Sequence, residues 1–309
     1  MRIGPNIDAA LSGFRLVREH PRTIVIWAAV CFAYSAAQGI FASATSGSGV
    51  MRFLALANQA NPNPDQVITT VVGIAPTYLV LVAVNMAFYA VFFAAANRAA
   101  VSPGQDHLGY LALGARELRQ FGLVTLLFGA TFTIYVALAI AASLVGAVVA
   151  MLAGAAVGVA VAATLVVLGL GYLWMRFSLA SPLTFATDRI NLLGSWALTR
   201  DSQWTILRTY LLALILTVAV YIVGMTLIIT LMAAAVGGFQ NLLTIASPDL
   251  SSVSQFVSPP RMILLAMQAV LSALILPVAV CPAIEIYRGM QPVASVAPKE
   301  SGGEGSPWS

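Results

Sequence analysis

Charged residues are scarce in this chain. They make up 8% of its 309 residues, whereas a soluble globular protein carries about a quarter. The mean hydropathy is +0.92, and several uncharged runs exceed the roughly 18 residues of a membrane-crossing helix. The sequence has no short alternating strands of the kind that form a barrel. Without a barrel, a backbone in lipid can make all its hydrogen bonds only as helix. These features exclude an ordinary soluble domain and predict an all-α, polytopic transmembrane helical bundle.

Histidine and cysteine are also scarce, with two of each. His20 and His107 stand beside charged residues, and no His or Cys pair has the spacing of a metal site. Cys31 and Cys281 lie inside apolar runs, where we expect buried thiols rather than a disulfide. A Gly-x-Ser-x-Gly elbow, a phosphate loop and a dinucleotide fingerprint are all missing. We therefore predict no enzymatic activity, no metal and no cofactor.

Six apolar segments are long enough to cross a hydrocarbon core of about 30 Å. They cover residues 23–44, 75–96, 121–147, 150–174, 210–235 and 262–286. No cleavage site precedes the first span, which we expect to stay in the mature protein. The third and fourth spans share one charge-free run, which we expect to reverse within residues 146–154. The predicted membrane domain covers residues 1–290, and residues 291–309 are predicted to be a disordered cytoplasmic tail.

Smaller features refine these spans. Pro76 stands near the predicted start of the second span, and Pro277 and Pro282 should kink the sixth. A short interfacial helix is predicted at residues 51–57. Small residues recur at every fourth position from Gly146 to Ala162, which lets helix backbones approach closely in lipid. We expect this stripe to contact another helix of the same chain rather than a second copy.

The positive residues indicate the orientation. An even number of spans puts both termini on one side, and 13 of the 15 Lys and Arg residues fall on that side. Only Arg52 and Arg261 fall opposite. Because cytoplasmic loops carry the excess of Lys and Arg, both termini should be cytoplasmic. Arginine outnumbers lysine fourteen to one, which is typical of a GC-rich bacterial genome. The dispersed charges do not predict a nucleic-acid partner.

Three stretches share a Gly, an Arg five or six residues later, and then an apolar span. The pairs are Gly13 with Arg18, Gly114 with Arg119, and Gly194 with Arg200. Each stretch precedes two predicted spans, so the chain can be read as three repeats of an interfacial helix plus a helical hairpin, at about residues 6–98, 106–176 and 190–288. Chance matches at membrane edges are the alternative.

The third stretch also resembles a known family. "RFSLASPLTFATDRINLLGSWALTRDSQW", residues 176–204, is similar to a signature of bacterial polytopic inner-membrane proteins related to the membrane domain of glycerophosphoryl diester phosphodiesterases. The matching residues that we single out are Arg176, Pro182, Ser195, Trp196, Thr199, Arg200 and Trp204. These 309 residues contain no soluble segment large enough for the family's catalytic barrel. The resemblance therefore implies a membrane module and not a phosphodiesterase.

Three polar residues are candidates for a site within the membrane. Arg176 and Glu285 fall near the cytoplasmic ends of spans, and Asn85 falls near a midplane. Charges at membrane depth are costly, so they usually pair or face water. Local Arg–Glu pairing and interhelical hydrogen bonds are the plainer explanation. A continuous polar cavity joining the three residues would instead favour transport.

We expect a non-enzymatic membrane module with a structural, lipid-interacting or partner-binding role. Its partners would be membrane lipids and a possible membrane protein, contacted by a cytoplasmic collar of interfacial helices. The alternative is a transporter of a small molecule or lipid that uses the charged residues at the cytoplasmic ends of the spans.

Overall fold

The protein is a helical membrane protein that crosses the membrane several times. The computed structural model describes residues 7–59, 61–101, 108–200, 202–247, 250 and 252–290, and every regular element in them is a helix. Six of these helices are long and apolar enough to cross a membrane, as predicted. They are α3 (Pro21–Ala57), α4 (Pro64–Val101), α5 (Ala115–Ala153), α6 (Ala155–Phe177), α9 (Gln203–Ala235) and α12 (Pro259–Met290). The predicted tail lies outside the described residues.

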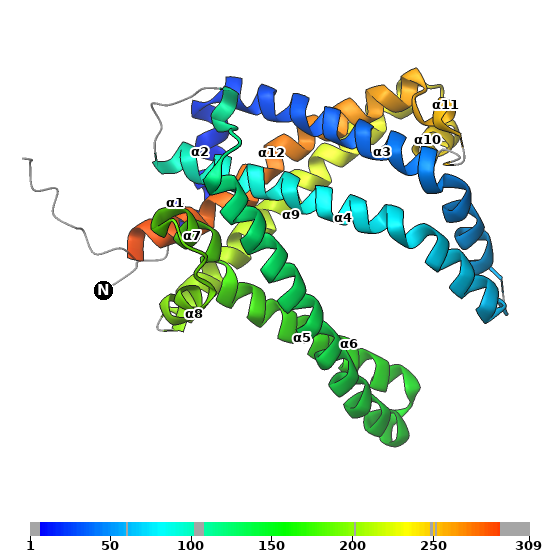
Figure 1. Ribbon diagram of the computed structural model, residues 1–309, viewed down its shortest axis with the longest axis horizontal. Helices are drawn as coiled ribbons and strands as arrows, with labels where there is room; N and C mark the ends of the chain where they lie inside the picture. Colours follow the sequence, from blue (N-terminus) through cyan, green and yellow to red (C-terminus); the bar gives the residue numbers. More distant parts are fainter. Residues whose placement is uncertain are drawn as a thin grey trace, which may run out of the picture.

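Short helices cap the two ends of the long ones (Figure 1). One end carries α1 (Ile7–Ala10), α2 (Ser12–Glu19), the 3-10 helix η1 (Leu108–Tyr110), α7 (Ala180–Thr187) and α8 (Leu192–Arg200). We call it the arginine end, because it holds all the described arginines except Arg52 and Arg261. The opposite end, the far end, carries α10 (Phe239–Ala246), α11 (Val253–Phe256) and those two arginines. The predicted separation of charge between the ends is confirmed for the described residues.

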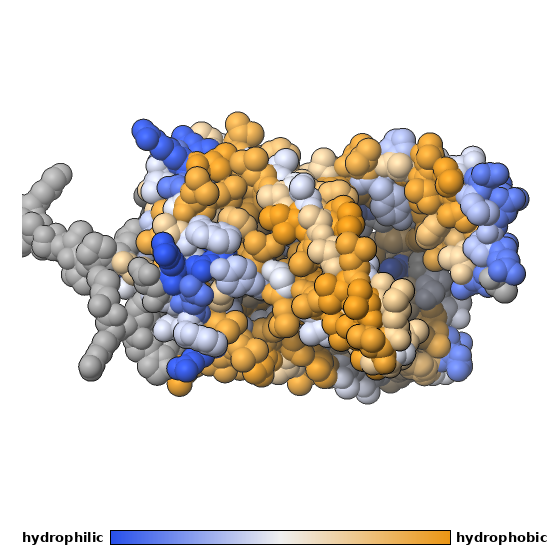
Figure 2. Space-filling view, turned by 90° about the horizontal axis from the view of Figure 1, so that it is seen from below, coloured by the Kyte–Doolittle hydropathy of each residue, from blue (hydrophilic) through white to orange (hydrophobic). Residues whose placement is uncertain are grey.

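The long helices pair as three hairpins: α3 with α4, α5 with α6, and α9 with α12. Helix α12 packs against both α3 and α9, and α4 links α3 to α5. The α5–α6 hairpin splays away from the other four long helices (Figure 1). Hydrophilic residues gather at both ends of the molecule, and hydrophobic side chains cover much of the length between them (Figure 2). That distribution matches a protein with headgroups at both ends and lipid chains around its middle.

The turn between α5 and α6 confirms the predicted reversal. Gly154 has a φ of 92° there, a backbone conformation that side chains disfavour. The small-residue stripe lies between the two helices of this hairpin. A Cβ on Gly158 would stand 2.4 Å from the Gly146 carbonyl oxygen and 2.6 Å from Ala150 Cβ. The stripe therefore contacts another helix of the same chain, as expected.

Several predicted boundaries are wrong. Residues 51–57 are not a separate interfacial helix but the last turns of α3, which packs closely on α4 where Gly49 meets Ile74. Pro76 lies inside α4 rather than near its start, because α4 begins at Pro64. The predicted short helix of the second repeat is absent, since α5 runs unbroken from Ala115 into the span. Buried contacts of its first turns, described below, hold this end of α5 against α4.

Pro277 and Pro282 both lie inside α12, which runs as one helix through them, and the expected kink stays a prediction. Cys31 and Cys281 are buried free thiols, as predicted. Separate short helices precede α3 and α9, namely α1 and α2 in one case and α8 in the other, and the reading of the chain as three repeats stays a prediction. Helix α2 also packs on α12, where a Cβ on Gly13 would stand 2.5 Å from the Pro277 carbonyl oxygen. A glycine is required there because the two backbones approach so closely.

Candidate functional site

Four residues of the sequence signature meet around Arg176, which lies in the last turn of α6 and is one of the four. The Arg176 side chain is buried, and its Nε and Nη2 donate to the Tyr172 hydroxyl at 3.0 and 2.8 Å. Its guanidinium carbon lies 5.0 Å from the centre of the Tyr172 ring and 5.1 Å from that of the Trp196 ring. Cation–π attraction of this kind strengthens when water is excluded.

The same cluster attaches α8 to α6. The Ser195 hydroxyl donates to the backbone oxygen of Arg176 at 2.8 Å, and Nη1 of Arg176 lies 3.5 Å from the Thr199 hydroxyl. Ser195 and Thr199 are both fully buried. Four of the signature residues therefore form one contact between two helices, with Arg176 at its centre. Neutral groups hold its guanidinium, since no described carboxylate pairs with it.

The other signature residues lie apart from this contact. Pro182 is buried in α7. Arg200, at the end of α8, and Trp204, in the first turn of α9, are exposed. Trp174, on α6, and Trp204 both keep 73% of their surface accessible. Exposed tryptophans near the ends of membrane-crossing helices are typical of the headgroup layer.

Glu285 forms the local pair that the sequence suggested. Its Oε2 lies 3.7 Å from Arg288 Nη1, one turn later on α12, and 3.8 Å from Arg15 Nη2 on α2. Arg15 is a partner that sequence reasoning missed, because it comes from the opposite end of the chain. About a third of the Glu285 side chain is exposed. The pairing fixes α2 to the end of α12.

Asn85 hydrogen-bonds across the α3–α4 hairpin. Its Oδ1 accepts from the Tyr34 hydroxyl at 2.8 Å, and the same hydroxyl accepts from Gln38 Nε2 at 2.6 Å. The predicted interhelical hydrogen bond is thus present. Arg176, Glu285 and Asn85 each have their own local partners, and no hydrogen bond or ion pair among the described residues joins any two of them.

A second polar cluster, not predicted from the sequence, joins α4, α5 and α7. Arg98 forms an ion pair with the buried Glu117 and donates to the backbone oxygen of Tyr110. Beside it, Asn97 Nδ2 donates to the Ser181 hydroxyl at 3.0 Å. Ser181 in turn donates to Gln120 Oε1 at 3.2 Å, and Gln120 Nε2 donates back to the Ser181 backbone oxygen at 2.9 Å. We call this cluster, made of Asn97, Arg98, Glu117, Gln120 and Ser181, the polar clamp.

At the arginine end some of the remaining arginines pair with a carboxylate and others do not. The carboxylate of Asp188 is shared by Arg116 and Arg119. Arg189, Arg200 and Arg208 are exposed and form no ion pair with a described carboxylate. Within the described residues no three His, Cys, Asp or Glu side chains are grouped as metal ligands would be. The arrangement therefore offers positive charge and aromatic surface.

Comparison with protein-family models, with curated proteins and with solved structures found no match to this chain.

Proposed function

We propose that this chain is a non-enzymatic membrane module that binds anionic lipid headgroups at its arginine end. The observation that carries the proposal is a set of three exposed arginines, near the two ends of α8 and in the first turns of α9, that have no described carboxylate partner: Arg189, Arg200 and Arg208. Arg18 in α2 and Arg22 in α3 are also exposed without such a partner. Glu117, Asp188 and Glu285 cannot neutralise them, because other arginines already engage these carboxylates. Positive charge left over at a membrane surface attracts anionic lipid by about 1 kcal/mol per arginine.

The aromatic side chains of the same region support this function. Trp204 and Arg208 stand one turn apart on α9, which puts them on one face of the helix. An indole ring prefers the depth of the headgroups, where its apolar body and its N–H are both accommodated. Arg208 would then meet lipid phosphates at the same depth, so both side chains support one interfacial surface.

The proposal also includes the membrane in which the protein lies and the side that its arginine end faces. The excess of arginine at the end that carries both N- and C-terminal helices favours a cytoplasmic position for that end. We propose the bacterial inner membrane as the site of the protein. The resemblance of residues 176–204 to the membrane domain of glycerophosphoryl diester phosphodiesterases remains part of this proposal, and it implies a membrane module rather than a phosphodiesterase.

Native mass spectrometry of the full chain tests the function. The chain is titrated in detergent with phosphatidylglycerol or phosphatidylcholine, and the lipids that stay bound are counted. Removing three arginines in Arg189→Gln/Arg200→Gln/Arg208→Gln should weaken retention of phosphatidylglycerol about a hundredfold, at about 1 kcal/mol per arginine. Retention of phosphatidylcholine should change little. Added salt should mimic the variant, because exposed charges are screened.

The matched control removes three arginines that already have carboxylate partners. Arg15→Gln/Arg116→Gln/Arg288→Gln changes the net charge by the same amount but leaves Arg189, Arg200 and Arg208 in place. It should retain most of the preference for phosphatidylglycerol. Equal losses in the two triple variants would show that binding follows net charge alone, and the proposal would be wrong.

Transport of a lipid is the second candidate, favoured by one observation. The exposed Asn85 side chain, with Tyr34 and Gln38, places hydrogen-bonding groups in the middle of α3 and α4. Vesicles with a fluorescent, dithionite-sensitive phosphatidylglycerol test it. If the reconstituted chain moves lipid between leaflets, dithionite should bleach more label than in protein-free vesicles, and Asn85→Leu should remove the excess. Bleaching equal to that of empty vesicles would exclude lipid transport.

A further inference from the structure

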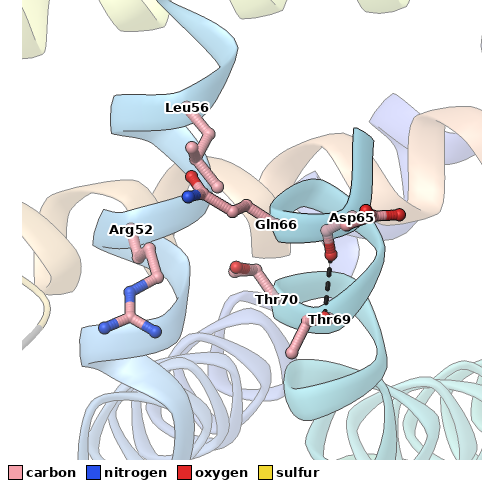
Figure 3. Close-up of a pocket in the computed structure, with 6 residues that line it drawn as sticks. All are labelled: Arg52, Leu56, Asp65, Gln66, Thr69 and Thr70. Atoms are coloured by element: carbon pink, nitrogen blue, oxygen red, sulfur yellow. Dashed lines mark hydrogen bonds between the residues drawn. The ribbon is translucent and has the colours of Figure 1, made fainter. Parts of the chain in front are cut away.

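The far end of the molecule contains a polar cavity that the proposed function does not use. It lies between the end of α3 and the start of α4 and has a volume of about 480 Å³, within the usual range for a ligand pocket. Its lining consists of Arg52, Leu56, Asp65, Gln66, Thr69 and Thr70. Figure 3 shows that Arg52 and Leu56 come from α3 and the other four residues from α4.

The lengths of α3 and α4 support placing the cavity at the depth of lipid headgroups. Helix α3 has 37 residues, many more than the roughly 20 that cross the hydrocarbon core. Its last turns, which carry Arg52 and Leu56, therefore reach beyond the acyl chains. The same holds for the first turns of α4, a helix of 38 residues. A ligand in this cavity would meet polar surroundings rather than lipid tails.

Arg52 is the positive group of the cavity and has no described carboxylate partner. The other described arginine of the far end, Arg261, is occupied differently. It donates to the backbone oxygens of Ile245 and Ala246, at 3.4 and 3.1 Å, and so caps the end of α10. Arg52 is therefore the far-end guanidinium that stays available to a ligand among the described residues.

Helix α4 contributes hydrogen-bonding groups opposite Arg52. The Gln66 amide extends toward α3, and the Thr70 hydroxyl faces the same side (Figure 3). Thr70 is buried, yet its hydroxyl forms no hydrogen bond with the described residues. The Thr69 hydroxyl differs, since it donates to the Asp65 backbone oxygen at 2.8 Å. The one acidic group, the Asp65 carboxylate, points away from α3 (Figure 3).

We propose that this cavity binds a phosphate group, with Arg52 as the ion-pair partner and with Thr70 and Gln66 as hydrogen-bond donors. Arginine matches phosphate oxygens with its planar fork of N–H groups, and charge-assisted bonds of this kind are the strong ones. The first turn of α4 adds the positive end of a helix dipole. A phosphate ester could come from a phospholipid headgroup of that leaflet or from a soluble compound, and both share this chemistry. The site is independent of the arginine end.

Chemical modification of Arg52 tests the site directly. Phenylglyoxal reacts with accessible guanidinium groups, and peptide mass spectrometry reads the extent of reaction at each arginine of the full chain in detergent. Three probes are compared: dihexanoyl-phosphatidylglycerol, sn-glycerol 3-phosphate and inorganic phosphate. A probe present at four times its dissociation constant should slow the reaction of Arg52 about fivefold by simple occupancy. Octyl glucoside, an amphiphile without phosphate, should not.

The outcomes separate the two sources. Protection by the short-chain phospholipid alone identifies a lipid headgroup, whereas protection by glycerol phosphate or inorganic phosphate identifies a soluble phosphate compound. In either case Thr70→Val, which keeps the side-chain shape, should reduce protection at Arg52 but leave Arg18, at the arginine end, unaffected. Lack of protection by all three probes, or protection that Thr70→Val leaves unchanged, would overturn the proposal. Neither result depends on lipid binding at the arginine end.

Discussion

The α5–α6 hairpin and the group formed by α3, α4 and α12 hold their helices together in different ways. In the group, large side chains interlock: Trp27 is fully buried, meets Phe92 edge-on with ring centres 5.3 Å apart, and donates to the Gly109 backbone oxygen at 2.8 Å. In the hairpin, the backbones themselves touch through Gly146 and Gly158. Aromatic side chains stabilise helix packing through their large contact area, whereas small residues stabilise it by letting the helix backbones approach closely.

The two regions also differ in how much of each helix is covered. Each long helix can be compared by the buried share of its own most apolar 18-residue stretch. That share is 39% in α12 but only 6% in the span that begins at Ala155. The hairpin therefore exposes apolar side chains on most of its surface, as a lipid-facing element does. The hairpin is attached to the rest mainly through α4, α7 and α8. A few buried polar contacts thus fix the hairpin, while many apolar contacts fix the group.

Among variants that test this difference between the two regions, breaking the polar clamp should lower the free energy of unfolding most. Glu117→Gln removes the buried charge that pairs with Arg98 and leaves that guanidinium uncompensated. Loss of one partner of a buried ion pair costs about 3 kcal/mol or more. The measurement is the free energy of unfolding in mixed micelles of detergent and SDS. We expect the hairpin to separate from α4 before the α3–α4–α12 group unfolds.

Asp188→Asn is the control for that variant. It makes the same change of charge, but Asp188 and its partners Arg116 and Arg119 are largely exposed. Exposed pairs contribute less than about 1 kcal/mol. Equal destabilisation by the two variants would mean that burial of Glu117 does not matter and that the clamp does not fix the hairpin.

Enlarging a glycine inside the hairpin should have the next largest effect. Gly158→Leu places a side chain against the Gly146 carbonyl oxygen, a backbone atom that cannot move aside without opening the hairpin. Overpacking of this kind costs about 1–3 kcal/mol. Gly171→Leu, also on α6, is the control, because a Cβ there meets nothing within 4 Å. A similar loss of stability in both variants would argue against close packing at Gly158.

The sequence was sufficient to predict the features that depend on local composition. Hydropathy located the six long helices, the small residues located the turn at Gly154, and the positive charges separated the two ends. Each of these depends on what a stretch of chain contains and not on its distant neighbours. The expected intrachain contact of the Gly146–Gly158 stripe also followed, since the stripe continues on both sides of the turn.

The polar clamp could not be predicted because its members come from three distant segments. Gln120 directly follows Arg119 in the stretch expected to form an interfacial helix, yet it is fully buried against Ser181. One signal was available: Asn97 and Arg98 directly follow a long apolar run, where polar groups need partners. Nothing in the sequence distinguishes Glu117, the partner of Arg98, from the other charged residues near the ends of the spans. Gly13 was noticed for its spacing, but its close approach to Pro277 depends on the tertiary packing of α2.

The smallest effect on the free energy of unfolding is expected at Glu285, whose ion pairs are exposed. Glu285→Gln weakens contacts of 3.7 and 3.8 Å to Arg288 and Arg15, and all three side chains are at least one-third exposed. We expect a loss below about 1 kcal/mol in the same unfolding measurement, because solvent screens such pairs. The variant also separates the two candidate functions. A lipid-binding module should keep its preference for phosphatidylglycerol, whereas a transporter that depends on this carboxylate would lose lipid movement while remaining folded.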